Sequence, residues 1–449
     1  MKKSNLVLYL QQMLDNSADG FPDFKHHNSV HVYGGDSLGV SFAPAGVHPP
    51  KPEVPKPEEV SRPCFYLYDQ GADALTSFIQ ETRSDATLAR VSPGEVRDEC
   101  EIWLRERRGS PNPAPLCEEN VKTILKALRA RVEPREVTVH IPGVHLEGVV
   151  INVGSVRFEP IALTRERIFG ASKRHIESSA HPPDQHEQLF VSSTPWIEQI
   201  LPKSGCSASF EVSATPATAA ELALKDIRAA CSLLQVYAWF VDRREDRTRN
   251  TMPSCDVSVS MDGTVSKSET GISYNFSRRG WDEHFVLTEE MTRHLVERCF
   301  LGELSGLFLS DVNLTTTDES VRTAIWWLSR STISIIPSEA LMFAVISTER
   351  LLFPIGSQNT KDKWETRLLW LLKDESEAFR KIVASNLAQI YEARSRMVHS
   401  GITQVEMETA KLSREIAFSV LMAFCDFWAQ GKSQSEILSG LDIKAKGLG

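Results

Sequence analysis

The residues best suited to chemistry in this chain of 449 residues lie in the run Arg394-Ser395-Arg396-Met397-Val398-His399. The run closes a predicted helix over 376–399, which Gly401 ends. On a helical wheel Arg394 falls on the apolar face of this helix, whose members are Val383, Leu387, Ile390, Tyr391 and Val398. A charge on an apolar face is costly unless it is paired or used, because it must be taken out of water. The run is therefore the first candidate for a functional site.

A second charge lies on the apolar face of another predicted helix, over 338–353. Glu349 is at the centre of a stripe formed by Met342, Val345, Ile346, Leu352 and Phe353. Its sign is opposite to that of Arg394, so the two helices are predicted to share a buried ion pair. Such a pair can fix the register of the two helices, and an arginine that is oriented by a carboxylate can also bind phosphate. The sequence leaves both roles open.

His399 does not lie on the same helical face as Arg394. It is about 140° round a straight helix and about 7.5 Å along it. The two side chains converge on one cleft only if the backbone unwinds just before Gly401. The simpler interpretation of the pair alone is a histidine that caps the C-terminal end of the helix.

The stretch IYEARSRMVHSG at 390–401 resembles the signature of the Apea-like HEPN family, which carries the Arg-x4-6-His motif of HEPN ribonucleases. The segment 322–354 also resembles that family, and its end, Glu349-Arg350-Leu351-Leu352-Phe353, fits the family's helix. Two positions depart from the pattern: Arg350 stands where a small residue is more usual, and Ser400 precedes Gly401. The resemblance covers roughly 317–430 and identifies nothing in 1–310.

The resemblance implies a helical bundle that dimerises so that two Arg-x4-6-His motifs face one cleft. Family members cut single-stranded RNA without a metal, through attack of the 2′-hydroxyl on the adjacent phosphate. By this resemblance His399 would be the general acid/base and Arg394 would stabilise charge on the phosphate. Ser395 would be a polar helper, and Glu349 would orient Arg394. The implied partners are a second copy of the chain and RNA, either single-stranded or tRNA-like, with no cofactor or metal.

The resemblance also implies, more distantly, a role in bacterial antiphage defence or a toxin system, with the first domain as a sensor or regulator whose trigger the sequence does not indicate. A different function is a non-catalytic bundle for dimerisation or RNA binding, which is favoured by the net charge of −9 and the absence of a clear basic groove. That function is indicated if Arg394 and Glu349 are mutually buried while His399 points to bulk solvent. A third possibility, an enzyme with its active site in 64–310, has no motif behind it.

The chain divides by composition into four segments. Residues 1–63 end in a proline-rich linker over 44–63, and 431–449 form a small, polar tail that is predicted to be loose. Between them, 64–315 has an α+β pattern and 316–430 is all helical. The predicted fold class is therefore an α+β N-terminal region followed by an all-α bundle.

Strands and helices follow from residue periodicity and from turn residues. Strands are predicted at 64–68, 137–141, 148–163, 209–214, 255–261 and 271–276, with a hairpin turn at Met261-Asp262-Gly263. Helices are predicted at 217–241, 317–329 (capped by Thr317 or Asp318), 338–353, 361–373, 376–399 and 405–429.

Cysteine usage and hydropathy bear on the cellular compartment. The eight cysteines are scattered and form no Cys-x-x-Cys pair, which indicates neither a zinc ribbon nor a disulfide framework. No 18-residue uncharged apolar stretch occurs, so a cytoplasmic protein without a membrane span is expected. His175, His181 and His186 have no helix-face ligand spacing, and a solvated loop is favoured over a metal site there.

Overall fold

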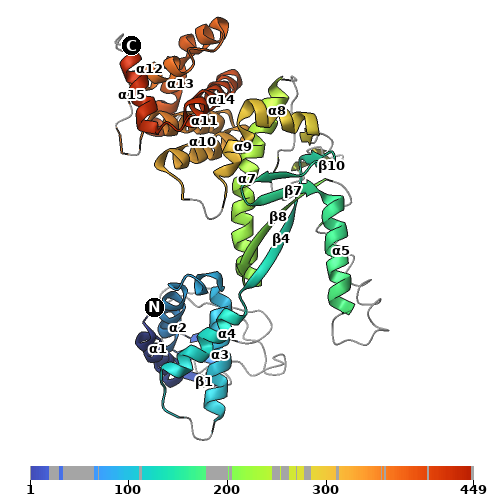
Figure 1. Cartoon of the computed structure of the whole chain (residues 1–449), viewed down its shortest axis with the longest axis vertical. Helices are drawn as coiled ribbons and strands as arrows, with labels where there is room; N and C mark the ends of the chain where they lie inside the picture. Colours follow the sequence, from blue (N-terminus) through green and yellow to red (C-terminus); the bar gives the residue numbers. More distant parts are fainter. Residues whose placement is uncertain are drawn as a thin grey trace. The chain divides into compact units, whose positions relative to one another are not determined.

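The structure of the protein is a computed structural model, shown in Figure 1. It describes residues 2–19, 30–33, 65–68, 70–110, 114–177, 201, 205–244, 253, 262–268, 271–277, 285–309, 313–354, 356–357, 360–401 and 404–445. The proline-rich stretch 44–63 and the strand predicted at 255–261 lie outside the described residues.

The chain folds into two compact units that cut across the four predicted segments. The first comprises Met1–Glu136 and Val212–Leu222, and the second comprises Val137–Glu211 and Ala223–Gly449. Neither the predicted boundary at 63/64 nor that at 315/316 separates them. The physical reason is that elements on the two sides of each predicted boundary pack together.

The first unit packs four helices on a small antiparallel sheet. Its helices are α1 (Lys3–Asp15), α2 (Gln70–Arg83), α3 (Pro93–Gly109) and α4 (Glu118–Ala130), with the short 3-10 helix η2 (Leu88–Arg90). Its strands are β1 (Ser17–Asp19), β2 (Val30–Tyr33) and β3 (Phe65–Tyr68), in the order β1-β3-β2.

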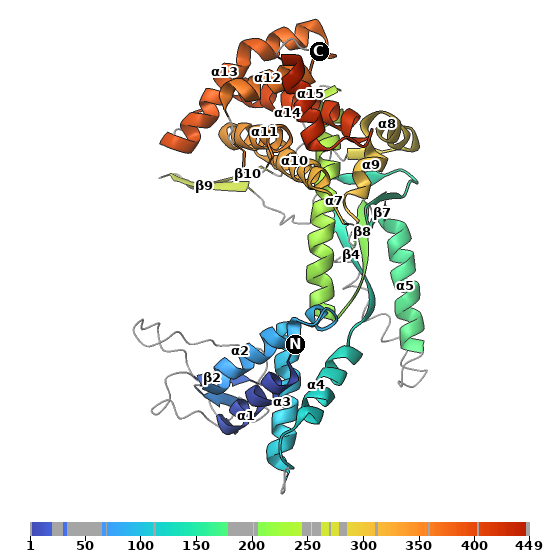
Figure 2. The same ribbon diagram turned by 60° about the vertical axis from the view of Figure 1, so that its left-hand side comes forward.

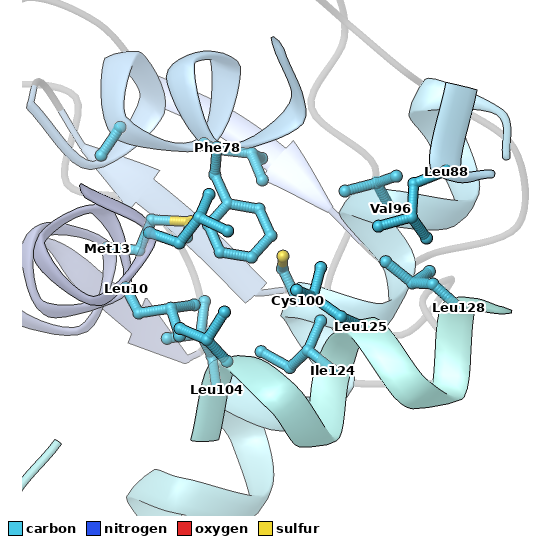
Figure 3. Close-up of a cluster of buried hydrophobic side chains, with 14 of the residues drawn as sticks. Leu10, Met13, Phe78, Leu88, Val96, Cys100, Leu104, Ile124, Leu125 and Leu128 are labelled. Carbon is cyan, nitrogen blue, oxygen red and sulfur yellow. The ribbon is translucent and has the colours of Figure 1, made fainter. Parts of the chain in front are cut away.

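One core joins the two sides of the predicted N-terminal linker. Leu10 and Met13 of α1 are fully buried, and Figure 3 shows them with Phe78 of α2, Cys100 of α3 and Ile124 of α4. Because α1 buries its apolar face against helices that follow the linker, α1 does not form a separate piece.

The second unit begins with an antiparallel sheet in the order β4-β8-β7-β6. Its elements are β4 (Glu133–Ile141), β5 (Val144–Leu146), β6 (Ile151–Val153), β7 (Val156–Pro160), α5 (Ile161–Glu177), β8 (Cys206–Ala214), α7 (Pro216–Arg244), β9 (Asp262–Ser268), β10 (Gly271–Ser277), β11 (Phe285–Leu287), α8 (Glu289–Cys299) and α9 (Leu301–Gly306). β11 pairs in parallel with β5. The first unit includes the first residues of β4, the end of β8 and the start of α7.

The single strand predicted at 148–163 is instead a hairpin followed by a helix. Gly154 lies in its turn with φ +61°, and a Cβ there would lie 2.1 Å from the carbonyl oxygen of Phe308. Only glycine satisfies both conditions, so the strand must break here. α5 then starts at Ile161, which the sequence pattern did not indicate.

The hairpin predicted at Met261-Gly263 is also displaced. Asp262 and Gly263 lie within β9, and the pairing of Ser268 with Gly271 puts the chain reversal after Ser268. Val265 is then opposite Tyr274 in the ladder, a cross-strand pair of the kind that stabilises sheets.

The all-helical C-terminal region is confirmed, and Figures 1 and 2 show its helices gathered together. The helices are α10 (Thr316–Ile333), α11 (Pro337–Leu352), α12 (Lys361–Leu371), α13 (Glu377–Ser400), α14 (Met407–Trp428) and α15 (Gln434–Ala445). Thr315, rather than Thr317 or Asp318, caps α10, because its hydroxyl accepts the N–H of Asp318 in a capping box. Phe240 of α7 stacks on Phe418 of α14 with ring centroids 4.3 Å apart, which joins the helical region to the rest of the second unit.

The prediction that 431–449 form a loose tail was wrong, because α15 lies in this segment and is part of the fold. Arg367 of α12 forms a two-pronged salt bridge with Asp442, with both N···O distances 2.8 Å, and also donates to the carbonyl of Leu352. Gln434 is buried and its amide donates to the carbonyls of Arg350 and Leu351 at the end of α11. These long-range partners satisfy helix-end carbonyls that would otherwise be orphaned.

Replacement of Arg367 tests this attachment. Arg367→Met should lower the free energy of unfolding by about 2–3 kcal/mol, because it leaves the buried Leu352 carbonyl without its donor and removes both bonds from Arg367 to the Asp442 carboxylate. The measurement is urea denaturation followed by tryptophan fluorescence. The matched control is Lys381→Met, which removes an exposed pair with Glu377 and should leave stability unchanged. Equal losses of unfolding free energy in the two variants would mean that the attachment of α15 through Arg367 stabilises the fold no more than an exposed surface pair does.

Candidate functional site

The predicted ion pair between Glu349 and Arg394 is present. Glu349 lies near the end of α11 and Arg394 near the end of α13, and Nη2 of Arg394 donates to Oε2 of Glu349 at 3.1 Å. Leu351 and Leu352 of α11 and Ile390 of α13 are buried beside them in the sequence, so each helix turns its charged residue toward the interior. Glu349 and Arg394 thus lie on the packed faces of their helices, as the helical wheel predicts.

The two partners differ in burial. Glu349 is 8% exposed, whereas the side chain of Arg394 is 22% exposed. The contact is single rather than two-pronged, since Oε1 of Glu349 and Nε of Arg394 are buried and have no hydrogen-bond partner among the described residues. A half-satisfied pair is less stabilising than a fork-to-fork pair, because each buried unpaired polar atom has lost its water. Arg394 therefore retains N–H donors that the ion pair does not use, and part of its side chain stays exposed to solvent.

Burial raises the pKa of the Glu349 carboxyl above its ordinary value, and the guanidinium of Arg394 acts in the opposite direction. The ionised carboxylate is thus tolerated at this position through Arg394 rather than through water. Loss of the arginine would leave the buried carboxylate of Glu349 without a compensating charge.

His399 is exposed and lies apart from this pair. α13 stays helical through Ser400, and only Gly401 turns into the left-handed region with φ +65°. The backbone does not unwind before Gly401, so His399 remains about 140° round the helix from Arg394. Val398, which was expected on the packed face, is 52% exposed. One chain by itself does not bring Arg394 and His399 together.

The remaining expectations for this run are partly met. Ser395 is partly exposed beside Arg394 in sequence. In the part of the chain that the structure describes, the side chain of His399 forms no hydrogen bond, so it is not a C-capping histidine. The end of α13 is closed instead by the N–H of Gly401, which donates to the carbonyl of Met397 at 3.3 Å.

No cluster of three or more potential metal ligands is found among the described residues. His175 lies in α5 rather than in the expected loop, and His181 and His186 lie outside the described residues. Of the six cysteines described, all but Cys117 are buried, and burial raises the pKa of the thiols of Cys206 and Cys425. Thiols of this kind are inert. No described helix has the length and apolar content to cross a bilayer.

A pocket of about 460 Å³ in the second unit was missed by the sequence analysis. It is lined by α7, by the turn after α9 and by α10, including Lys225, Arg322 and Trp326. The available signal was the i, i+4 spacing of Arg322 and Trp326, which puts both on one helical face. The pairing of that face with α7 is a tertiary contact between residues about 100 apart, and no local pattern specifies it.

Comparisons of the chain with protein-family models, with curated proteins and with solved structures give no match.

The raised pKa of Glu349 predicts a distinctive pH dependence of stability. A carboxyl that binds its proton more tightly in the folded state contributes stability that is fully present below about pH 4.5 and is lost as the pH rises through the folded-state pKa. Glu349→Gln removes this contribution, so the variant should gain stability relative to the natural protein as the pH rises from 4.5 to neutral.

Thermal or urea unfolding of both proteins across this pH range is the measurement. Arg394→Met serves as the counterpart, because it deletes the charge and the hydrogen bond that lower the pKa of Glu349 and should steepen the loss of stability with rising pH. A stability difference between Glu349→Gln and the natural protein that stays constant with pH would contradict the assignment.

Proposed function

We propose that the C-terminal helices form an HEPN-type bundle and that the protein is a metal-independent endoribonuclease that acts as a dimer. The observation that carries the proposal is the arginine of an Arg-x4-His run held by a buried carboxylate while keeping 22% of its side chain exposed. A guanidinium anchored at one end and open at the other is suited to a phosphate oxygen. The resemblance of 390–401 to the Apea-like HEPN signature supplies the reaction type.

In the proposed reaction the 2′-oxygen of a ribose forms a bond to the adjacent phosphorus, and the bond from phosphorus to the 5′-oxygen breaks. The products are a 2′,3′-cyclic phosphate and a free 5′-hydroxyl. One copy of His399 takes the proton from the 2′-hydroxyl, and the His399 of the second chain gives one to the leaving 5′-oxygen. Arg394 stabilises the negative charge that develops on the phosphate, Glu349 orients Arg394, and Ser395 is a polar contact for the substrate.

Helix geometry is the reason for a dimer. Arg394 and His399 diverge on α13, so one chain cannot place both on a single phosphate. Two copies with the ends of α13 facing each other would contribute two arginines and two histidines to one cleft. The exposure of His399 is what such a composite site requires, since a histidine buried in one chain could not reach the other.

A non-catalytic dimerisation or RNA-binding module is the second candidate. Two of its three conditions are met in a single chain, because Glu349 is buried and His399 is exposed to solvent. The third is not, since Arg394 is only partly buried. The net charge of −9 also favours this candidate. Activity measurements separate the two.

The RNA substrate is proposed to be single-stranded or tRNA-like, and the setting to be the bacterial cytoplasm, in antiphage defence or a toxin system. The first unit and the sheet of the second are then available to regulate the nuclease. These assignments rest on the family resemblance alone.

Cleavage of RNA in the presence of EDTA is the direct test. The natural protein should cut single-stranded RNA, and His399→Ala should lower the rate by about 10²–10⁴-fold, because a general acid/base is lost. Arg394→Ala should lower it by at least about 10²-fold, because charge on the phosphate is no longer stabilised. Gel analysis of cleavage with end-group determination of the cyclic phosphate is the measurement.

Matched controls lie close by. Arg396→Ala removes a half-exposed arginine two residues from Arg394, and His294→Ala removes a histidine on α8; both variants should cut at the natural rate. Size-exclusion chromatography with light scattering checks that His399→Ala keeps the dimer. Equal cleavage by His399→Ala would contradict the role of His399, whereas no cleavage by any form would leave the non-catalytic module as the function.

A further inference from the structure

The pocket beside α7 and α10 has the features of a ligand site that is separate from Glu349, Arg394 and His399. None of these three residues lines it. Figures 1 and 2 both show α9 and α10 next to α7, the elements that supply its walls. Its volume of about 460 Å³ is within the range of about 300–1,000 Å³ that small-molecule sites occupy.

Two cations from different helices line the pocket. Lys225 comes from α7 and Arg322 from α10, and both side chains are exposed. Within the described ranges neither forms a salt bridge or a hydrogen bond, so their charges are available to a ligand. A lysine and an arginine that converge from two helices can bind the oxygens of one phosphate, the arginine through two parallel N–H donors.

An aromatic surface lies one helical turn from Arg322. Trp326 lines the pocket and is 45% exposed, which is unusual for so large an apolar ring. Its ring meets that of Trp327 edge-on with centroids 4.6 Å apart, and Trp327 packs in turn on Phe343 of α11. The exposed indole is therefore held by the rings behind it and offers a fixed surface for stacking.

The pocket also contains an acceptor and an apolar floor. The carboxylate of Asp226 also lines the pocket, beside Lys225. Phe308 and Leu309 form its apolar part. Two cations and one carboxylate leave a net positive charge, which favours an anionic ligand.

We propose that this pocket binds a nucleoside 5′-phosphate, with the base on Trp326 and the phosphate on Lys225 and Arg322. The ligand is a free mononucleotide or the phosphorylated 5′ end of an RNA, which share this chemistry. The site stands whether or not the protein cleaves RNA, because none of its residues belongs to the proposed catalytic set.

Isothermal titration calorimetry on the full chain tests the proposal with adenosine 5′-monophosphate, adenosine, ribose 5-phosphate and a short 5′-phosphorylated RNA. The mononucleotide should bind more tightly than either of its halves, because each half lacks one of the two contacts. Trp326→Ala and Arg322→Gln should each weaken binding by about tenfold or more. Binding by the RNA but not by the mononucleotide would support the site with an RNA end as its source.

Matched variants exclude indirect effects. Trp370→Ala removes an exposed tryptophan of α12, and Arg330→Gln removes an exposed arginine of α10; neither residue lines the pocket, and both variants should bind normally. His399→Ala should also bind normally, so a failure of the nuclease proposal is distinguishable. Circular dichroism checks the fold of each variant. Absence of binding by every probe, or binding by Trp326→Ala and Arg322→Gln that is as tight as binding by the natural protein, would overturn the proposal.

Discussion

The burial of one carboxylate, that of Glu349, is the constraint on which the arrangement of α11 and α13 depends. Burial opposes its ionisation, and Arg394 is the cause that acts the other way. If the sequence of α13 were shifted by one residue relative to α11, the arginine would lie about 100° further round the helix and the carboxylate would lose its partner. Both helices bury apolar residues beside the pair, so the correct register satisfies packing and charge together. A pair of this kind contributes specificity of packing more than net stability.

The same requirement, that buried polar groups find partners, explains other contacts of the helical region. Arg414 of α14 donates to the carbonyls of Ser331 and Ser334, where α10 ends. Ser347 of α11 donates to the carbonyl of Ala324 in the middle of α10. Each bond joins a side chain to a backbone group of a different helix, so the helices are held in place by polar contacts as well as by apolar packing. α15 is attached in the same way.

The rigidity that positions Arg394 also separates it from His399. Because α13 is regular to Ser400, any site that uses both residues must be completed by a second chain. The pocket beside α7 and α10 lies on a different part of the second unit, and one of its helices, α10, packs on α11, which carries Glu349. Trp326 is on α10, and Trp327 next to it packs on Phe343 of α11, the helix that carries Glu349. A ligand on Trp326 would therefore contact a helix that is packed directly against the one that orients Arg394.

The sequence by itself determined the helices of the C-terminal region and the two opposite charges on their apolar faces, because both follow from a periodicity of 3.6 residues. In the α+β region it also indicated β3, β4, β8 and β10. Tertiary structure alone decided that α1 shares a core with α2, that the predicted tail is a helix anchored by Arg367, and that Lys225 and Arg322 line one pocket. The reason is that these features are contacts between residues far apart in the chain, which residue periodicity does not encode. The separation of His399 from Arg394 was decided at one point, where a regular helix continued to Ser400 instead of unwinding.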